Sequence, residues 1–184
     1  MTTLDAGAGR AEAVAPDAPA IALIGPMAAG KSSLGRKLAS RLGRRFIDTD
    51  REIVRAYGPV ADIFAERGEP AFRALEADAV RDALAPGRVV ALGGGAVLDP
   101  GTRALLRGVR VALVTVSPEA AARRIRGGTR PLVADGIDAW RRIAAEREPI
   151  YRELADIAVD TSARPMAAIV DELEAWAAGQ EEEQ

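Results

Sequence analysis

The sequence predicts an α/β fold of three layers, in which a parallel sheet lies between two layers of helices. Short apolar runs alternate along the chain with longer segments whose apolar residues recur every three or four positions. Between the first apolar run and the first helical segment, residues 25–32 read GPMAAGKS. These letters match the phosphate-loop pattern G-x-x-x-x-G-K-[ST], which joins a strand to a helix in nucleotide-binding proteins.

Each expected element has a local reason. Strands are expected where a short apolar run is bounded by turn-forming or charged residues, and helices where the apolar period is close to 3.6, as with Leu34, Leu38 and Leu42. The expected strands are Ile21–Gly25, Arg45–Asp48, Val89–Leu92, Val109–Val116 and Ile157–Asp160. The expected helices are Lys31–Leu42, Asp50–Ala56, Val60–Glu66, Glu69–Leu84, Pro100–Leu106, Pro118–Ile125, Ile137–Leu154 and Pro165–Ala177.

The length of 184 residues suits one domain, which we place at residues 20–178. Residues 1–19 are rich in Ala, Gly, Asp and Pro, and residues 179–184 are polar and acidic, so both are expected to be disordered tails. A formal net charge of −2 provides no basic footprint for nucleic acid, and no apolar stretch approaches the roughly 20 residues of a membrane span. We expect a cytoplasmic monomer without a nucleic-acid or membrane partner.

Two residue types are absent. The chain has no cysteine, which excludes disulfides and thiolate chemistry, and no histidine, which excludes histidine-bound zinc. A general base must therefore be a carboxylate, with Lys or Tyr as weaker candidates.

The phosphate loop predicts binding of a nucleoside triphosphate. Gly25 and Gly30 let the backbone turn close to an anion, so that successive N–H groups point at the phosphates. Lys31 supplies a mobile charge for the β- and γ-phosphates, and the Ser32 hydroxyl is placed to bind Mg²⁺. The alternative is a glycine-rich turn that only links strand to helix. The predicted ATP-binding residues of the loop are Ala28, Ala29, Gly30, Lys31, Ser32 and Ser33.

Two aspartates close the second expected strand. Asp48 and Asp50 are two residues apart, so in an extended segment both would face the same side. Ligands of open α/β sheets collect at the carboxyl ends of the strands, which would bring these carboxylates to Mg²⁺ and to an attacking hydroxyl. The alternative is that one of them only caps the following helix.

The third expected strand runs into Gly93-Gly94-Gly95 instead of a metal-binding carboxylate. These glycines allow a backbone to pass close to a small ligand, although a flexible turn is the alternative. Arg73 and Arg147 are candidates for a planar grip on a carboxylate, although either would otherwise be an ordinary surface arginine. Arg130 follows Gly127-Gly128-Thr129 and precedes a proline, which is typical of a loop that closes over phosphates.

Taken together, these segments resemble the shikimate kinases, a family of small phosphate-loop kinases, over roughly residues 21–176. The resemblance implies a five-stranded parallel sheet in the order 2-3-1-4-5, substrate-binding helices at about 50–84 and a lid at about 126–137. It also implies transfer of the γ-phosphoryl group of ATP to the 3-hydroxyl of shikimate, a step of aromatic amino-acid biosynthesis. The matching pieces are residues 25–33, 35–39, 46–50, 72–73 with 76, 92–97, 130–132, 147 with 149 and 151, 159–161 and 164–165.

On the acceptor side, the resemblance implies that Asp50 holds the reacting hydroxyls and is the candidate base. It implies that Arg73 and Arg147 bind the shikimate carboxylate, and that the Gly94 and Gly95 backbone also contacts shikimate. Phosphoryl transfer depends mainly on positioning and electrostatics, so one aspartate that aligns a hydroxyl is chemically sufficient.

On the nucleotide side, the resemblance implies that Lys31 and Arg130 stabilise charge on the transferring group. Ser32 would bind Mg²⁺ directly, and Asp48 would bind it through water. Arg164, with Arg123 or Arg124, would flank the adenine. This chain departs from the family in having Pro-Met-Ala-Ala at residues 26–29, where a glycine or serine is common, and in a short lid.

Two other functions share the phosphate loop. A gluconate-type or other small-metabolite kinase would need neither a carboxylate clamp nor the three glycines. A non-catalytic nucleotide-sensing regulator would be expected to carry an added DNA-binding or dimerising segment and to lack Asp50.

Overall fold

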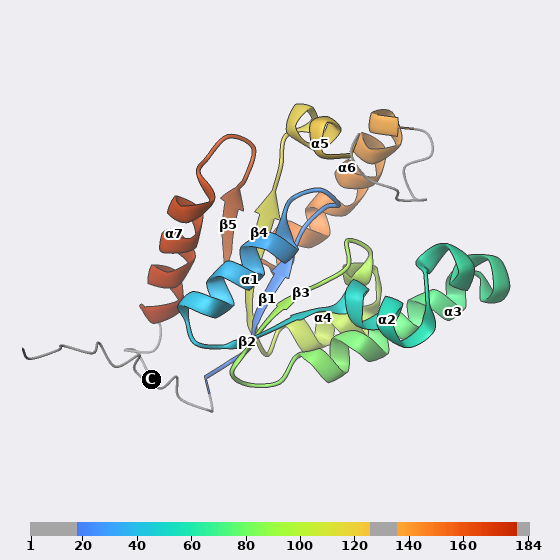
Figure 1. The fold of residues 1–184 in the computed structure, drawn as a ribbon, viewed down its shortest axis with the longest axis horizontal. Helices are drawn as coiled ribbons and strands as arrows, with labels where there is room; N and C mark the ends of the chain where they lie inside the picture. The colour runs from blue at the N-terminus through green and yellow to red at the C-terminus, as the bar shows by residue number, and fades with distance from the viewer. Residues whose placement is uncertain (1–17, 126–135, 180–184) are drawn as a thin grey trace, which may run out of the picture.

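The computed structural model describes residues 18–125 and 136–179 (Figure 1). Most of the two predicted tails, most of the predicted lid and Arg130 lie outside the described residues. Within the described ranges, no helix combines the length and the apolarity that a bilayer crossing would need.

The described strands form one parallel sheet in the order β2-β3-β1-β4-β5, which confirms the predicted fold class and strand order. The central strand β1 pairs with β3 on one side and β4 on the other, with Leu23 opposite Ala91 and Ala112. The strands are β1 (Ile21–Ile24), β2 (Arg45–Asp48), β3 (Arg88–Ala91), β4 (Arg110–Thr115) and β5 (Ile157–Asp160).

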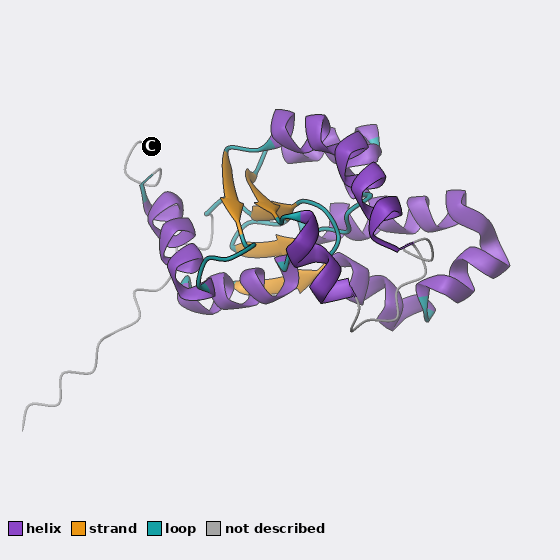
Figure 2. Cartoon of the chain, turned by 90° about the horizontal axis from the view of Figure 1, so that it is seen from above, coloured by secondary structure: helices purple, strands orange, loops and turns teal. Residues whose placement is uncertain are grey.

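Helices lie on both faces of the sheet (Figure 2). Because successive side chains of β1 alternate between faces, Ile21 and Leu23 join one core cluster while Ala22 and Ile24 join the other. Helices α1 and α7 contribute to the first cluster, and α3, α4 and α6 to the second. The helices are α1 (Lys31–Arg41), α2 (Thr49–Tyr57), α3 (Val60–Ala83), the short 3₁₀ helix η1 (Ala96–Leu98), α4 (Pro100–Leu106), α5 (Pro118–Ile125), α6 (Gly136–Leu154) and α7 (Met166–Ala178).

Helices α2 and α3 extend from the sheet as an arm with a core of its own (Figure 1). Ile53, Ile63 and Phe72 are buried together there. The two helices predicted at Val60–Glu66 and Glu69–Leu84 form one element, α3, with a break at Gly68, whose φ of 75° and ψ of 169° are not helical. A glycine adopts this positive φ without a steric penalty, so the chain can change direction before Pro70 starts the second part.

Candidate active site

A cavity of about 870 Å³ lies at the carboxyl ends of β1, β2 and β3. The phosphate loop, the first turn of α2, the second part of α3, the glycines after β3 and one face of α6 line it. The lining residues with polar side chains or a site glycine are Gly30, Lys31, Ser32, Ser33, Asp48, Asp50, Arg51, Arg55, Arg73, Glu76, Gly94, Gly95, Arg124, Trp140, Arg147 and Tyr151.

The turn of the phosphate loop depends on Gly25. Its φ is 135°, and an added Cβ would lie 2.2 Å from the backbone oxygen of Val114 on β4. A strand backbone cannot move away, so only glycine fits there. Ala28 adopts a φ of 64°, which is left-handed and which alanine enters at a cost of about 1 kcal/mol.

Backbone carbonyls of the loop are held by its own lysine and by side chains from distant parts of the chain. The Lys31 ammonium donates to Gly25 O at 2.7 Å and to Pro26 O at 2.9 Å. Trp140 Nε1 on α6 donates to Met27 O at 2.9 Å. The Thr161 hydroxyl, which follows β5, donates to Ala29 O at 2.8 Å. These bonds fix the loop backbone and leave its N–H groups to face an anion.

Arg124 is the α5 arginine that reaches this loop. Its Nη1 donates to Ala28 O at 2.9 Å and to the Thr161 hydroxyl at 3.0 Å, and Arg124 lines the cavity. Arg123 is not among the cavity-lining residues, and neither is Arg164, whose Nη2 pairs with Glu172 at 2.6 Å. Of the predicted adenine-side arginines, the structure therefore brings only Arg124 to the cavity.

Asp48 and Asp50 both line the cavity, but not as neighbours on an extended strand. Strand β2 ends at Asp48, and Asp50 lies in the first turn of α2, so the expected extended spacing is wrong. Asp48 also caps the helix, because its Oδ1 accepts from Arg51 N at 3.2 Å. Its side chain is buried, and its second oxygen lies 3.9 Å from Arg51 Nε.

Arg73 is held on α3 by two glutamates. Its Nη1 donates to Glu76 Oε2 at 2.6 Å, and its Nη2 donates to Glu69 Oε1 at 3.1 Å. Partial burial lowers the pKa of Arg73, but the hydrogen bonds and charges of Glu76 and Glu69 raise it more. The guanidinium therefore stays charged and directed along one side of the cavity.

Glu76 is the most buried acidic side chain of the site, with 3 % of the residue exposed. Burial raises its pKa above the ordinary value of 4.5, and the charge of Asp50 adds to that increase, whereas Arg73 and Arg147 oppose it. The pKa of Arg73 is raised by the same contact, and desolvation of Glu76 is the largest cause of the raised pKa of Glu76.

Two of the three consecutive glycines lie directly against charged side chains. An added Cβ on Gly93 would lie 2.5 Å from Asp50 Oδ1 and 2.5 Å from Glu76 Oε1. An added Cβ on Gly95 would lie 2.2 Å from Arg73 Nη1. At Gly94 the nearest atom would be 3.5 Å away. The glycines thus allow charged side chains to approach the backbone, which favours the steric interpretation over a flexible turn.

Helix α6 carries Arg147 and, one turn later, Tyr151 to the same cavity. The Tyr151 hydroxyl donates to Gly94 O at 2.5 Å. Burial raises the pKa of Tyr151 to about 12, although Arg147 opposes the increase. Tyr151 therefore keeps its proton at neutral pH and is not a general base.

The family model of shikimate kinases matches residues 27–178, which is more than half of the chain. The chain belongs to the shikimate kinase family. This confirms the predicted enzyme class and the predicted reaction, phosphorylation of shikimate by ATP. Shikimate kinase from Streptomyces coelicolor is 47% identical over 151 residues, covering 80% of this chain and 88% of the relative. Shikimate kinase from Mycobacterium avium is 46% identical over 158 residues, covering 83% and 90%.

Solved structures agree with this membership. Shikimate kinase from Acinetobacter baumannii, solved in complex with shikimate, has a TM-score of 0.83 and 31% identity, and covers 90% of this chain and 96% of that one. A gluconokinase from Sinorhizobium meliloti has a TM-score of 0.63 at 23% identity, covering 92% and 97%, so it shares the fold alone. The gluconate-type alternative thus has no support beyond architecture.

Sequence reasoning assigned no role to several residues that shape this shikimate kinase site. Glu76, Tyr151 and Thr161 lie in the segments that carry the resemblance, whereas Trp140 does not. Trp140 and Thr161 hold the phosphate loop, Glu76 holds Arg73, and Tyr151 holds Gly94. A local signal existed for Glu76, because a glutamate three residues after an arginine on a helix lies on the same face. No comparable signal marked Trp140, since its contact with Met27 spans 113 positions.

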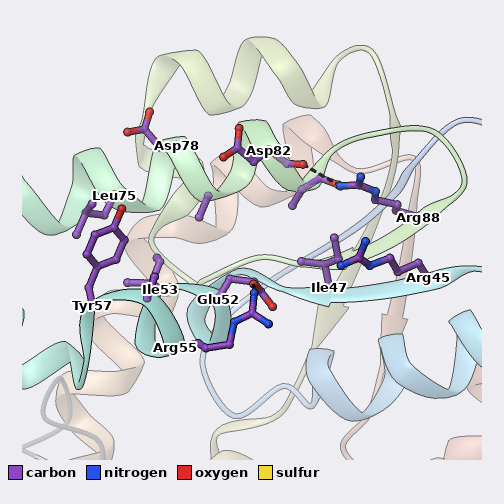
Figure 3. A pocket seen from close by; sticks show the side chains of 13 residues that line it. Arg45, Ile47, Glu52, Ile53, Arg55, Tyr57, Leu75, Asp78, Asp82 and Arg88 are labelled. Carbon is purple, nitrogen blue, oxygen red and sulfur yellow. Dashed lines mark hydrogen bonds and ion pairs between the residues drawn. The ribbon is translucent and has the colours of Figure 1, made fainter.

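A second cavity of about 370 Å³ lies on the back of the α2–α3 arm (Figure 3). Arg45 and Arg88, which are register partners on β2 and β3, point the same way beside it, and Tyr57 lies at its far end. None of the residues predicted from the sequence for the shikimate kinase reaction lines this cavity. Arg55 lines both this cavity and the one at the phosphate loop.

Among residues 18–125 and 136–179, no three acidic side chains gather as a ready-made metal site. A shikimate kinase does not need one, because Mg²⁺ at phosphate loops takes most of its ligands from phosphates and water. The Ser32 hydroxyl and the buried Asp48 carboxylate line the same cavity and are hard oxygen donors. These residues fit a hydrated magnesium ion.

Proposed function

We propose that the cavity of about 870 Å³ carries out the shikimate kinase reaction, with ATP on the phosphate loop and the 3-hydroxyl of shikimate facing Asp50. The observation that carries this proposal is the convergence of three chemical functions on one cavity. Lys31 comes from the phosphate loop, Asp50 from α2, and the two cations Arg73 and Arg147 come from α3 and α6.

On the acceptor side, Arg73 and Arg147 bind the carboxylate of shikimate. A guanidinium offers two parallel N–H groups to a carboxylate, and Glu76 and Glu69 keep Arg73 from rotating away. The backbone of Gly94 and Gly95 lies beside the ring. These contacts place a small ring acid with its hydroxyls toward the phosphate loop.

In the transfer step, Asp50 orients the 3-hydroxyl and accepts its proton. The oxygen of that hydroxyl forms a bond to the γ-phosphorus, the bond from the γ-phosphorus to the bridging oxygen breaks, and ADP leaves with that oxygen. Asp50 is suited to this because it lies in the first turn of α2 and lines the same cavity as Lys31.

On the nucleotide side, the N–H groups of the phosphate loop bind the phosphates, and Lys31 and Arg130 balance charge on the transferring group. Arg130 lies outside the described residues and keeps this role as a prediction from the sequence. Ser32 and, through water, Asp48 would hold Mg²⁺, which supplies charge neutralisation at the phosphates. Arg124 is preferred over Arg123 and Arg164 as the arginine beside the base, because it is the one at the cavity.

An ADP-release assay coupled to a chromogenic readout tests the proposal. The acceptors are shikimate, quinate, gluconate and buffer alone, each with ATP and Mg²⁺. We expect shikimate to stimulate ADP release well above the other three. Stimulation by gluconate and not by shikimate would overturn the acceptor assignment. Equal rates of ADP release in all four reactions would show ATP hydrolysis without transfer to an acceptor, which would also overturn it.

Sedimentation under assay conditions tests the expected monomer. If the chain works as a monomer, activity per chain should not depend on protein concentration. A specific activity that rises with protein concentration, together with a larger sedimenting species, would contradict the expected monomer.

A further inference from the structure

Tyr151 joins the core of the protein to the edge of the cavity. Its ring is packed in the core cluster under the sheet with Ile24, Leu92 and Leu113, and only 2% of the residue is exposed. Its hydroxyl emerges at the cavity, where it donates to Gly94 O at 2.5 Å. The ring is held by packing, so the hydroxyl has little freedom to move.

The Tyr151 hydroxyl lies beside the guanidinium of Arg147, which is one helical turn earlier on α6. Arg147 and Tyr151 are four residues apart on α6, so they lie on one face, both line the cavity, and the Arg147 guanidinium is near enough to the hydroxyl to oppose the rise in its pKa. The hydroxyl thus donates to Gly94 O with the Arg147 guanidinium beside it. It connects helix α6 to the loop after β3.

The Gly94 peptide lies between Tyr151 and the phosphate loop. An added Cβ at Gly94 would lie 3.5 Å from Met27 N, 3.6 Å from Gly25 O and 3.7 Å from the Tyr151 hydroxyl. Gly94 therefore lies close to both the phosphate loop and the Tyr151 hydroxyl.

We propose that Tyr151 is a positioning residue for the acceptor, whose hydroxyl sets the Arg147 guanidinium and the Gly94 peptide in a fixed mutual geometry. It touches neither phosphate nor hydroxyl of the reactants and acts through these two groups. The proposal rests on the acceptor contacts proposed above for Arg147 and for the Gly94 backbone.

The substitution Tyr151→Phe tests it, because the ring and its packing remain and one hydroxyl is lost. The Gly94 carbonyl loses a buried donor, and we expect KM for shikimate to rise roughly 5- to 20-fold. KM for ATP should change less than about twofold and kcat less than about threefold, because phosphate contacts are untouched. The matched control is Tyr57→Phe, which removes a hydroxyl from a tyrosine that is 50% exposed and outside this cavity. It should leave all three constants unchanged.

A merely structural role would give a different pattern. If Tyr151→Phe raised both KM values in parallel, or changed only the melting temperature, the positioning role would be overturned. An unchanged KM for shikimate in a folded variant would also overturn it.

The variant Arg147→Lys separates this proposal from the function on which it rests. If Arg147→Lys raises KM for shikimate and Tyr151→Phe does not, the acceptor site stands and the role of Tyr151 is wrong. If neither substitution changes KM for shikimate, the acceptor assignment itself is wrong. In the double variant we expect the loss from Tyr151→Phe to be smaller than in the unaltered chain, because part of its effect passes through Arg147. Fully additive losses would contradict that coupling.

Discussion

Arg73 Nη1 and Glu76 Oε2 lie 2.6 Å apart on one face of α3, with the glutamate side chain almost fully buried and the arginine facing the cavity. Burial of this carboxylate costs desolvation free energy. In this position the carboxylate holds the Arg73 guanidinium in one orientation. Glu76 is therefore expected to affect substrate binding more than catalysis, because it acts through Arg73 and not on the transferring group.

The substitution Glu76→Gln should weaken binding of the acceptor. Without the charged partner, Arg73 keeps only the more exposed Glu69, and we expect KM for shikimate to rise about tenfold or more with a small change in KM for ATP. Steady-state kinetics with each substrate varied in turn provide the measurement. The matched control is Asp78→Asn, which breaks an exposed i,i+3 pair with Arg81 on the same helix. Equal effects of the two substitutions would contradict the prediction.

Glu76 also makes stability depend on pH. Because folding raises its pKa above the ordinary 4.5, the folded chain holds a proton at this carboxyl more tightly than the unfolded chain. The stabilisation from that proton is complete below about pH 4.5 and is lost as the pH rises through the raised pKa. Glu76→Gln cannot ionise, so its melting temperature relative to the unaltered chain should be higher at pH 7 than at pH 4. Thermal melts across this range would show a constant difference if the inference is wrong.

Asp50→Asn should lower kcat by at least ~10²-fold, because the amide cannot accept the proton of the reacting hydroxyl. Affinity for ATP should change little, since Asp50 lies on α2 and the phosphates face the loop. Asp62→Asn is the control, because Asp62 is an exposed acid in the first turn of α3. Turnover that survives Asp50→Asn would remove Asp50 from its proposed role.

Arg73→Lys should raise KM for shikimate far more than KM for ATP. A lysine keeps the charge but loses the planar fork that meets a carboxylate with two parallel bonds. Arg81→Lys on the same helix is the control, because Arg81 is exposed and outside the cavity. The same increase in both KM values would show that the loss is not specific to the acceptor.

Gly95→Ala should also impair acceptor binding, through Arg73. The added methyl group would occupy the position of the guanidinium, and moving that group would break its bonds to Glu76 and Glu69. We expect KM for shikimate to rise at least fivefold, by roughly the loss of one charged hydrogen bond. Gly108→Ala, where the nearest atom to an added Cβ is 3.6 Å away, is the control. Normal kinetics for Gly95→Ala would mean that Arg73 has another stable position.

The sequence was sufficient where the physical cause is local. The phosphate loop, the strand rhythm and the glycines after β3 depend on short patterns, so the fold class, the strand order implied by the family and the cavity-lining residues of the loop could be predicted. The choice between Arg123 and Arg124 had no such local signal, and only the contacts of Arg124 with Ala28 and Thr161 distinguish the two.

The remainder depends on tertiary contacts. The extended spacing expected for Asp48 and Asp50 was wrong because the chain turns into α2 at Thr49, whose hydroxyl accepts from Gly93 N across 44 positions. The hydrogen bond from Tyr151 to Gly94 spans 57 positions and joins α6 to the loop after β3. No short pattern encodes such a meeting, so these partners became visible only in the folded chain.

Lys31 donates its ammonium protons to two carbonyls of its own loop, Gly25 O and Pro26 O. A phosphate group that recruits this charge must therefore displace existing acceptors, and the affinity gained for ATP is the difference between two sets of contacts. The same lysine contacts preserve the conformation of the loop between turnovers. When ADP departs, the lysine has partners to return to, so the next ATP meets a cradle whose backbone does not have to be rebuilt.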